Sequence, residues 1–298
     1  MMPKETVCGY AKINLHLDVK GRLADGYHSM ETVMQSVSLC DTVTVTLTDE
    51  PLCEATCVKA GVPTDEKNIA VRAAKLFAEK IGSQKGARIH IEKNIPMAAG
   101  LAGGSADAAA TLLAMNQLYN RPLTTNELCE LGAGLGVDVP FCIVGGTKYA
   151  DGKGEQLHSF PVMPPCTLVV ACGGEGVSTP WGYKLLDSRY GDFAEASCYT
   201  PHTTERLDDA MTDGDLAKIG SALYNVFEGP ILDERPVAAE IRRVMRDCGA
   251  EGAMMSGSGP SVFGLFSSEE MAKKAAELIQ AKHCFATVCH PVFPGKDE

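Results

Sequence analysis

Apolar and polar positions alternate along the first fifty residues, as they do in β-strands that bury one face. The alternation is clearest over residues 6–19 and 36–48, where β-branched side chains are frequent. Residues 68–81 instead repeat apolar side chains at helical spacing, and residues 87–92 return to a strand pattern. The first third of the chain therefore predicts a sheet with a helix packed on it.

A glycine-rich turn opens directly onto an alanine-rich helix in residues 95–119. Small and apolar side chains dominate residues 105–119, which predicts a helix with Asp107 in its first turn, where a negative charge suits the helix dipole. A loop with almost no side chains lets a ligand reach the free N–H groups of that turn. The junction predicts a phosphate-binding site, and a turn that only joins a strand to a helix is the alternative.

This loop matches neither of the two commonest phosphate-binding loops. It has no lysine, which a Walker loop requires, and its glycine spacing is not that of a dinucleotide fingerprint.

Prolines within residues 160–165 end the periodic pattern, so we expect a domain boundary there, with domains over residues 1–160 and 161–298. Before it, Thr124 and Glu127 read as the capping box of a short helix. After it, the pattern predicts helices at 206–227, 238–248 and 269–282, and strands at 167–171, up to Met255, 261–266 and 286–292. The expected fold class is α+β, with an α/β sandwich in the second half.

Charge and length narrow the possible functions. The 298 residues carry a formal net charge of -11, which argues against a nucleic-acid partner or an anionic membrane surface. The sequence has no apolar run long enough to span a bilayer and no signal-peptide core at its start, so we expect a cytoplasmic protein. The cysteines are mostly scattered singly, as in a reducing compartment, and the spacing around Cys53, Cys57, Cys284 and Cys289 is not that of a zinc site. We expect no metal held by the protein alone.

Two charged residues stand in apolar segments. Lys12 lies in Ala-Lys-Ile-Asn-Leu, and Asp138 lies between Val137 and Val139. Lys12 either meets an anion or points to solvent, and Asp138 either meets a cation or caps the turn before Pro140. If the two side chains meet, their attraction is about 4 kcal/mol at an effective dielectric near 20, before desolvation.

A third segment combines a turn with two flat side chains. Asp25, Gly26, Tyr27 and His28 follow one another, and a ring with an imidazole beside it can hold a nucleobase. A plain hairpin turn with a partly buried tyrosine is the alternative.

In this order the segments at 11–15, 25–28, 96–109, 137–141 and 255–259 resemble the GHMP kinases, the small-molecule kinases named for galactose, homoserine, mevalonate and phosphomevalonate. Within them the chain resembles the members that phosphorylate 4-diphosphocytidyl-2-C-methyl-D-erythritol in the non-mevalonate route to isoprenoid precursors. The resemblance spans nearly the whole chain and implies a two-domain fold, with a β-α-β domain for ATP and substrate followed by a ferredoxin-like sandwich.

The resemblance also implies roles for individual residues. Asp138 would orient or deprotonate the substrate hydroxyl, and Lys12 would hold that carboxylate and the phosphoryl group. The residues expected to wrap the phosphates of ATP are Pro96, Met97, Ala98, Ala99, Gly100, Leu101, Ala102, Gly103, Gly104, Ser105 and Ala106. Those expected to bind the substrate, with its cytidine diphosphate group, are Asn14, Tyr27, His28 and Tyr183, with Trp181 as the alternative to Tyr183. Gly257, Ser258 and Gly259 would buttress the phosphate loop.

The loop departs from the family pattern at two positions. Ala102 replaces a glycine, which we expect to require a negative φ there, and Ala106 replaces a serine, which leaves Ser105 as the one loop hydroxyl for phosphate or magnesium. We expect ATP and Mg²⁺ as cofactors, with the magnesium carried largely by ATP and water. A monomer or homodimer is expected. The alternatives are a homoserine or mevalonate kinase, and a nucleotide-binding regulator without activity.

Overall fold

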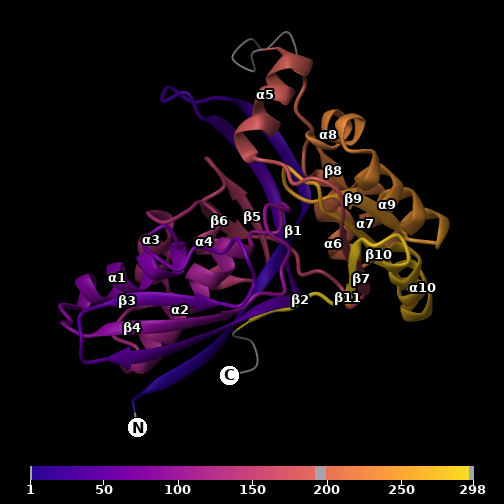
Figure 1. Cartoon of the computed structure of the whole chain (residues 1–298). Coiled ribbons are helices and arrows are strands. Elements are labelled where there is room, and N and C mark those ends of the chain that lie inside the picture. The colour runs from indigo at the N-terminus through magenta and orange to yellow at the C-terminus, as the bar shows by residue number, and fades with distance from the viewer. Residues whose placement is uncertain (1, 192–198, 295–298) are drawn as a thin grey trace.

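The computed structural model describes residues 2–191 and 199–294. Two β-sheets form its framework, and helices pack on them (Figure 1). One sheet has seven strands in the order β3-β4-β2-β1-β8, with β5 paired to β2 and β6 paired to β5. Its members are β1 (Lys4–Arg22), β2 (His28–Thr48), β3 (Cys53–Cys57), β4 (Gly86–Glu92), β5 (Thr147–Asp151), β6 (Gln156–Ser159) and β8 (Tyr224–Asn225).

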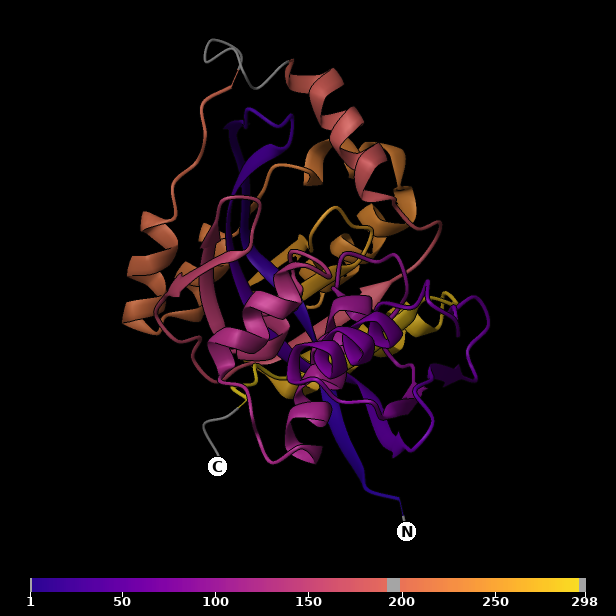
Figure 2. The same cartoon turned by 90° about the vertical axis from the view of Figure 1, so that its left-hand side faces the viewer.

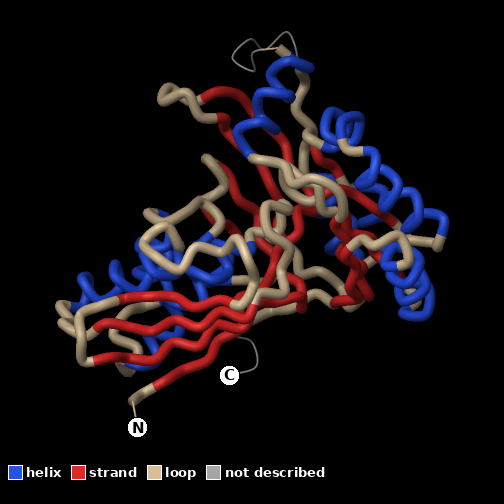
Figure 3. Tube along the Cα trace, in the orientation of Figure 1, coloured by secondary structure: helices blue, strands red, loops and turns tan. Residues whose placement is uncertain are grey.

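Helices cover one side of this sheet (Figure 3). They are α1 (Ile69–Ile81), α2 (Gly103–Leu118), α3 (Thr125–Ala133) and α4 (Val139–Val144). Their apolar side chains form one core with β2, β3 and β4, which includes Val43, Ile89 and Phe77. The capping box of Thr124 and Glu127 is present at the start of α3, as the sequence predicts.

The second sheet has the strand order β11-β7-β10-β9 and is antiparallel throughout. It consists of β7 (Thr167–Cys172), β9 (Gly252–Met255), β10 (Val262–Phe266) and β11 (Phe285–Cys289). The helices α9 (Pro236–Asp247) and α10 (Glu269–Gln280) pack their apolar faces against it. Leaving aside the elements between β7 and α9, which are α5 to α8 and β8, this is the β-α-β-β-α-β order of a ferredoxin-like sandwich, so the predicted α/β sandwich of the second half is confirmed.

The predicted single helix over residues 206–227 is wrong. The chain forms α6 (Glu205–Asp213), α7 (Leu216–Ala222) and then β8, which pairs parallel to β1. Gly214 adopts a left-handed φ of 67° and ends α6, and the Asp215 side chain caps α7. The remaining helices are α5 (Thr179–Tyr190) and α8 (Glu228–Glu234). Within the described ranges, no helix combines the length and apolarity that a membrane span requires.

The long hairpin of β1 and β2 runs from one sheet toward α5, as Figure 2 shows from the side. Its register shifts between Tyr10 and Lys12 and again between Asn14 and His16. Such bulges re-aim side chains next to functional sites. Here they leave Lys12 and Asn14 facing a cavity while both remain nearly buried, at 5% and 2% exposure. The alternative that Lys12 points to solvent is therefore wrong.

Close contact between β1 and the start of α2 sets the position of that helix. A Cβ atom at Gly9 would lie 2.6 Å from the carbonyl oxygen of Ala106. We expect Gly9→Ala to push α2 off the sheet and to lower the free energy of unfolding by about 1–3 kcal/mol, measured in urea. Gly229→Ala is the matched control, because a Cβ there meets nothing within 4 Å. Equal stabilities of the two variants would contradict this packing.

Candidate active site

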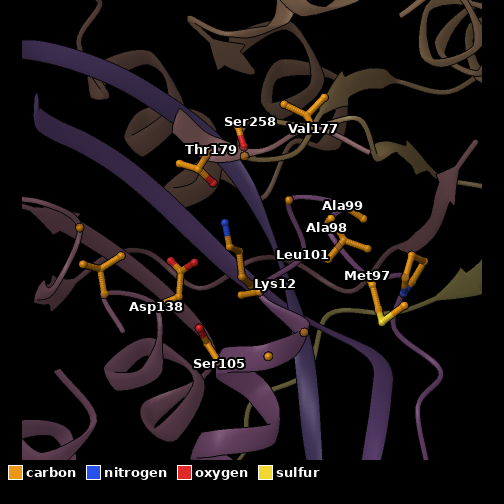
Figure 4. Close-up of a pocket in the computed structure, with 18 of the residues that line it drawn as sticks. Lys12, Met97, Ala98, Ala99, Leu101, Ser105, Asp138, Val177, Thr179 and Ser258 are labelled. Carbon is orange, nitrogen blue, oxygen red and sulfur yellow. The ribbon is translucent and has the colours of Figure 1, made fainter. Parts of the chain in front are cut away.

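A cavity of about 540 Å³ lies where β1, the glycine loop, α4, α5 and the turn after β9 meet (Figure 4). Most of the residues predicted for the site line it. They are Lys12, Asn14, Asp138, Tyr183, Gly257, Ser258 and every loop residue from Pro96 to Ser105. Ala106, Tyr27, His28 and Gly259 lie outside its wall. Ala106 is fully buried, because α2 begins at Gly103 and turns residue 106 toward β1.

The phosphate loop is held by the turn that follows β9. Ser256 Oγ donates to the carbonyl of Gly100 at 3.1 Å, and the N–H of Ser261 donates to Ala99 at 3.3 Å. The backbones of these two segments approach so closely that a Cβ at Gly100 would lie 2.2 Å from the carbonyl oxygen of Ser256. This contact is the geometry expected of a buttress. The first N–H groups of α2, which have no acceptor within the helix, begin where this loop ends.

The backbone of Ala102 differs from the sequence expectation. Its φ is 56°, in the left-handed region, and Ala98 has a φ of 50°. The expectation of a negative φ at Ala102 is therefore wrong. Ala102 is the N-cap residue of α2. Its left-handed backbone turns the chain into the helix, whose first residues line the cavity. Asp107 also lies beyond the first turn, because α2 begins two residues earlier than predicted.

Lys12 lies at one end of a chain of buried hydrogen bonds. Its ammonium donates to Asn14 Oδ1 at 2.8 Å, Asn14 Nδ2 donates to Thr32 Oγ1 at 2.8 Å, and Thr32 donates to the His16 carbonyl at 2.7 Å. These bonds fix the Asn14 amide with its oxygen toward Lys12. The ammonium is thereby held in place among the buried apolar side chains of Ala11, Ile13 and Leu15 on the same strand.

Lys12 and Asp138 both extend into the cavity, with Ser105 on α2 nearby and Thr179 and Ser258 across from them (Figure 4). Within the described part of the chain, the two charged groups do not form the predicted ion pair, because no Lys12–Asp138 contact lies within 4.0 Å. Asp138 does occupy the N-cap position of α4, but its side chain makes no capping hydrogen bond. Both groups therefore face the space that a ligand would occupy.

Of the predicted aromatic residues, Tyr183 lines the α5 end of the cavity, and His28 stacks on it from outside the cavity wall. The rings of His28 and Tyr183 stack at 4.4 Å, and the ring of Tyr183 meets Phe227 edge-on at 5.1 Å. Burial raises the pKa of Tyr183 well above its ordinary value. Tyr27 is 63% exposed at the tip of a hairpin turn, which is not the partly buried ring of the alternative interpretation. Trp181 packs under the Arg235 guanidinium at 4.7 Å, so of these two candidates Tyr183 is the one that lines the cavity.

Sequence reasoning missed a buried charge cluster in the cavity wall. Lys93 donates to both Asp41 and Asp107, at 2.7 Å for Asp107 Oδ2, and to the carbonyl of Gly103 at 3.0 Å. All three charged side chains are at most 5% exposed. Lys93 directly follows β4, and a lysine placed between a strand and a glycine loop was the available signal. The cluster fixes the first residue of α2.

The two carboxylates of this cluster are not equivalent. Asp41 Oδ1 also accepts from the N–H groups of Asn94 and Ile95, at 2.6 Å and 2.8 Å. Asp107 Oδ1 has no partner among the described residues. Burial raises the pKa of Asp107 to about 7, and nearby Asp41 adds to the effect. Of the two carboxyls, Asp107 therefore has the raised pKa and an oxygen without a hydrogen-bond donor in the described structure.

Lys153 is a second cavity residue that the sequence did not single out. It forms an ion pair with Asp25 at 2.7 Å and lies over the ring of Tyr27 at 4.1 Å. Among the described residues, no group of three or more His, Cys, Asp or Glu side chains is arranged to hold a metal ion.

Comparison with known proteins agrees with this geometry. The pattern of the GHMP kinases N terminal domain matches residues 68–146, and that of the GHMP kinases C terminal domain matches residues 207–283. The chain is 44% identical over 290 residues to 4-diphosphocytidyl-2-C-methyl-D-erythritol kinase of Pelobacter propionicus, covering 96% of this chain and 99% of the relative. The chain belongs to the GHMP kinases.

Two further matches place it within that family. A kinase of the same name from Caldicellulosiruptor saccharolyticus is 39% identical over 97% of this chain and 98% of the relative. A crystal structure of 4-(cytidine 5'-diphospho)-2C-methyl-D-erythritol kinase matches with a TM-score of 0.78 and 34% identity, over 96% of this chain and 98% of that one. The predicted family and two-part GHMP kinase fold are confirmed. A homoserine kinase structure from Cytophaga hutchinsonii, at 20% identity and a TM-score of 0.74, shares the fold.

The strain at Ala102 gives a stability test with a matched control. We expect Ala102→Gly to raise the free energy of unfolding by about 1 kcal/mol, because glycine adopts a positive φ without the Cβ clash. Ala108→Gly, inside α2, should lower the free energy of unfolding by about 1 kcal/mol. Urea unfolding measures both. A loss of stability in Ala102→Gly would contradict the left-handed backbone.

The charge cluster predicts unequal effects of two similar substitutions. Asp41→Asn should cost about 3 kcal/mol or more at pH 7. Of the two carboxylates paired with buried Lys93, it removes the one that also accepts from two backbone N–H groups. Asp107→Asn should change stability by less than about 1 kcal/mol at pH 7, since Asp107 is the group that takes up a proton.

The same assignment predicts a pH dependence. The folded-state pKa of Asp107 lies above its ordinary 3.8, so the wild type should lose stability as pH rises from about 4 to about 7. Asp107→Asn should lack that loss, which urea unfolding at several pH values can show. Parallel pH curves for the two proteins would contradict the assignment.

Proposed function

We propose that the protein transfers the γ-phosphoryl group of ATP to the 2-hydroxyl of 4-diphosphocytidyl-2-C-methyl-D-erythritol, giving ADP and the 2-phosphate. The observation that carries the proposal is the convergence of Lys12, Asp138 and the phosphate loop on one cavity that has an aromatic end at Tyr183. The names of the relatives that match over nearly the whole chain support the substrate.

Asp138 and Lys12 are the proposed catalytic residues. Phosphoryl transfer depends on positioning and on stabilising the charge of the transferred group. Asp138 accepts the hydrogen of the substrate hydroxyl and orients its oxygen toward the phosphorus, and the buried ammonium of Lys12 faces the transferred oxygens. Asn14 holds that ammonium and lies close enough to the cavity to contact the substrate near its reacting hydroxyl.

The loop from Pro96 to Ser105 is the proposed site of the ATP phosphates. Its glycines permit close approach, and the N–H groups at the start of α2 supply donors. The Ser105 hydroxyl on the cavity wall is an oxygen ligand of the kind that Mg²⁺ prefers, and it would hold the ion together with the phosphates and water. Bound magnesium neutralises charge on the transferring phosphoryl group.

The cytidine group is proposed to lie at the α5 end of the cavity. Tyr183 presents a ring for stacking, Tyr27 presents an exposed ring on the facing hairpin, and His28 offers an imidazole beside them. A homoserine or mevalonate kinase has no use for such an end, which favours the cytidyl substrate over those two alternatives. Gly257, Ser258 and Gly259 serve the loop and take no part in the chemistry.

A coupled assay of ADP release, with and without the cytidyl substrate, tests the function. Wild-type protein should release ADP only when both substrates are present, whereas a nucleotide-binding regulator would bind ATP without turnover. Asp138→Asn should lower kcat about 10²- to 10⁴-fold, because the hydroxyl loses its proton acceptor. Val162→Ala, at an exposed residue outside the cavity wall, is the control and should keep near wild-type turnover.

Two results would refute parts of this proposal. Equal turnover with homoserine or mevalonate in place of the cytidyl compound would refute the substrate. Wild-type turnover by Asp138→Asn would refute the role of Asp138.

A further inference from the structure

One carboxylate ties the tip of the long hairpin to α5. Asp187 Oδ1 pairs with His28 Nε2 at 2.9 Å, and Asp187 Oδ2 accepts from the Arg22 guanidinium at 3.0 Å. Arg22 ends β1 and His28 begins β2, so both flank the hairpin turn. These contacts join residues that are 165 and 159 positions apart in the sequence.

Asp187 and Tyr183 lie on the same face of α5, because they are four residues apart on a helix. The His28 ring therefore meets both of them. It stacks on Tyr183 at 4.4 Å with an angle of 19° between the ring planes, and its Nε2 atom forms a hydrogen bond with Asp187. A stack alone leaves a ring free to turn in its own plane, whereas a stack and a hydrogen bond together fix its orientation.

We infer that Asp187 is a positioning residue, which sets the orientation of the His28 ring that stacks on Tyr183, at the end of the cavity that receives the flat group of the substrate. The inference rests on the proposed function, which places the cytidine group at this end. An ionised carboxylate only accepts hydrogen bonds, so the proton of the shared bond belongs to His28 Nε2. The Arg22 guanidinium fixes the second carboxylate oxygen and keeps the carboxylate from rotating.

The hairpin turn keeps its shape by contacts that do not involve Asp187. Leu23 N–H donates to the Tyr27 carbonyl at 2.7 Å, and Gly26 N–H donates to the Leu23 carbonyl at 2.9 Å. Lys153 holds Asp25 from the side of β5 and β6. Loss of the Asp187 carboxylate should therefore remove the hydrogen bond that orients the His28 ring and leave the turn folded.

Steady-state kinetics of Asp187→Ala and Asp187→Asn test the inference. In Asp187→Ala we expect the KM of the cytidyl substrate to rise about tenfold, the loss of one good contact, with kcat and the KM of ATP within about twofold of wild type. Asp187→Asn should recover most of the loss, because its amide oxygen still accepts from His28. Asp233→Asn is the control, since Asp233 pairs with Arg189 of α5 at 3.9 Å and does not contact the hairpin in the described structure.

Calorimetric titration with CDP gives a readout that needs no turnover, and Asp187→Ala should bind CDP about tenfold more weakly than wild type. An unchanged KM and CDP affinity in Asp187→Ala would overturn the inference. So would a parallel loss of kcat and of both substrate affinities with a lowered melting temperature, which would mark a structural role. A wild type that binds CDP but fails to phosphorylate the cytidyl substrate would refute the proposed function, and the CDP affinities would still decide the role of Asp187.

Discussion

The structure depends on the contact of two loop backbones that come from different sheets. Gly100 in the phosphate loop and the turn from Ser256 to Gly259 approach so closely that neither Gly100 nor Gly257 has room for a side chain. This contact fixes the loop from the side of the second sheet, while Lys93 fixes its other end through the Gly103 carbonyl. The start of α2 is therefore held from two directions before any ligand binds, which is the preorganisation that phosphate binding requires.

The reacting end of the cavity depends on local irregularities in β1. Bulges lie on either side of Lys12 and Asn14, and both side chains face the cavity from a stretch of β1 whose neighbouring residues Ala11, Ile13 and Leu15 are apolar. The buried ammonium donates a hydrogen bond to Asn14 Oδ1, which offsets part of the cost of its burial, and it faces the cavity. Lys12 and Asp138 do not neutralise each other, so their charges remain available to the reacting groups.

The sequence predicted those parts that depend on neighbouring residues. Period and glycines predicted the long strands β1 and β2, the strand β4, the alternation of strands and helices in the second half and the glycine loop. The ferredoxin-like order and the roles of Lys12 and Asp138 came from the resemblance to the GHMP kinases. The sequence did not predict what depends on distant contacts or on register, such as the cluster of Lys93 with Asp41 and Asp107, or the link from Asp187 to the hairpin. The left-handed Ala102 was missed because alanine opposes that conformation locally, and the tertiary contacts of the loop override it. The break at Gly214 was a local signal that the apolar period concealed.

We propose that one cavity holds ATP on its loop side and the cytidyl substrate on its α5 side, with the reacting groups between Lys12 and Asp138. A crystal structure with a non-hydrolysable ATP analogue and the cytidyl substrate tests it most directly. We expect the substrate 2-hydroxyl oxygen to lie about 3 Å from the Asp138 carboxylate, in line with the γ-phosphorus and its leaving oxygen. A γ-phosphate bound away from Lys12, or a cytosine ring away from Tyr183, would contradict it.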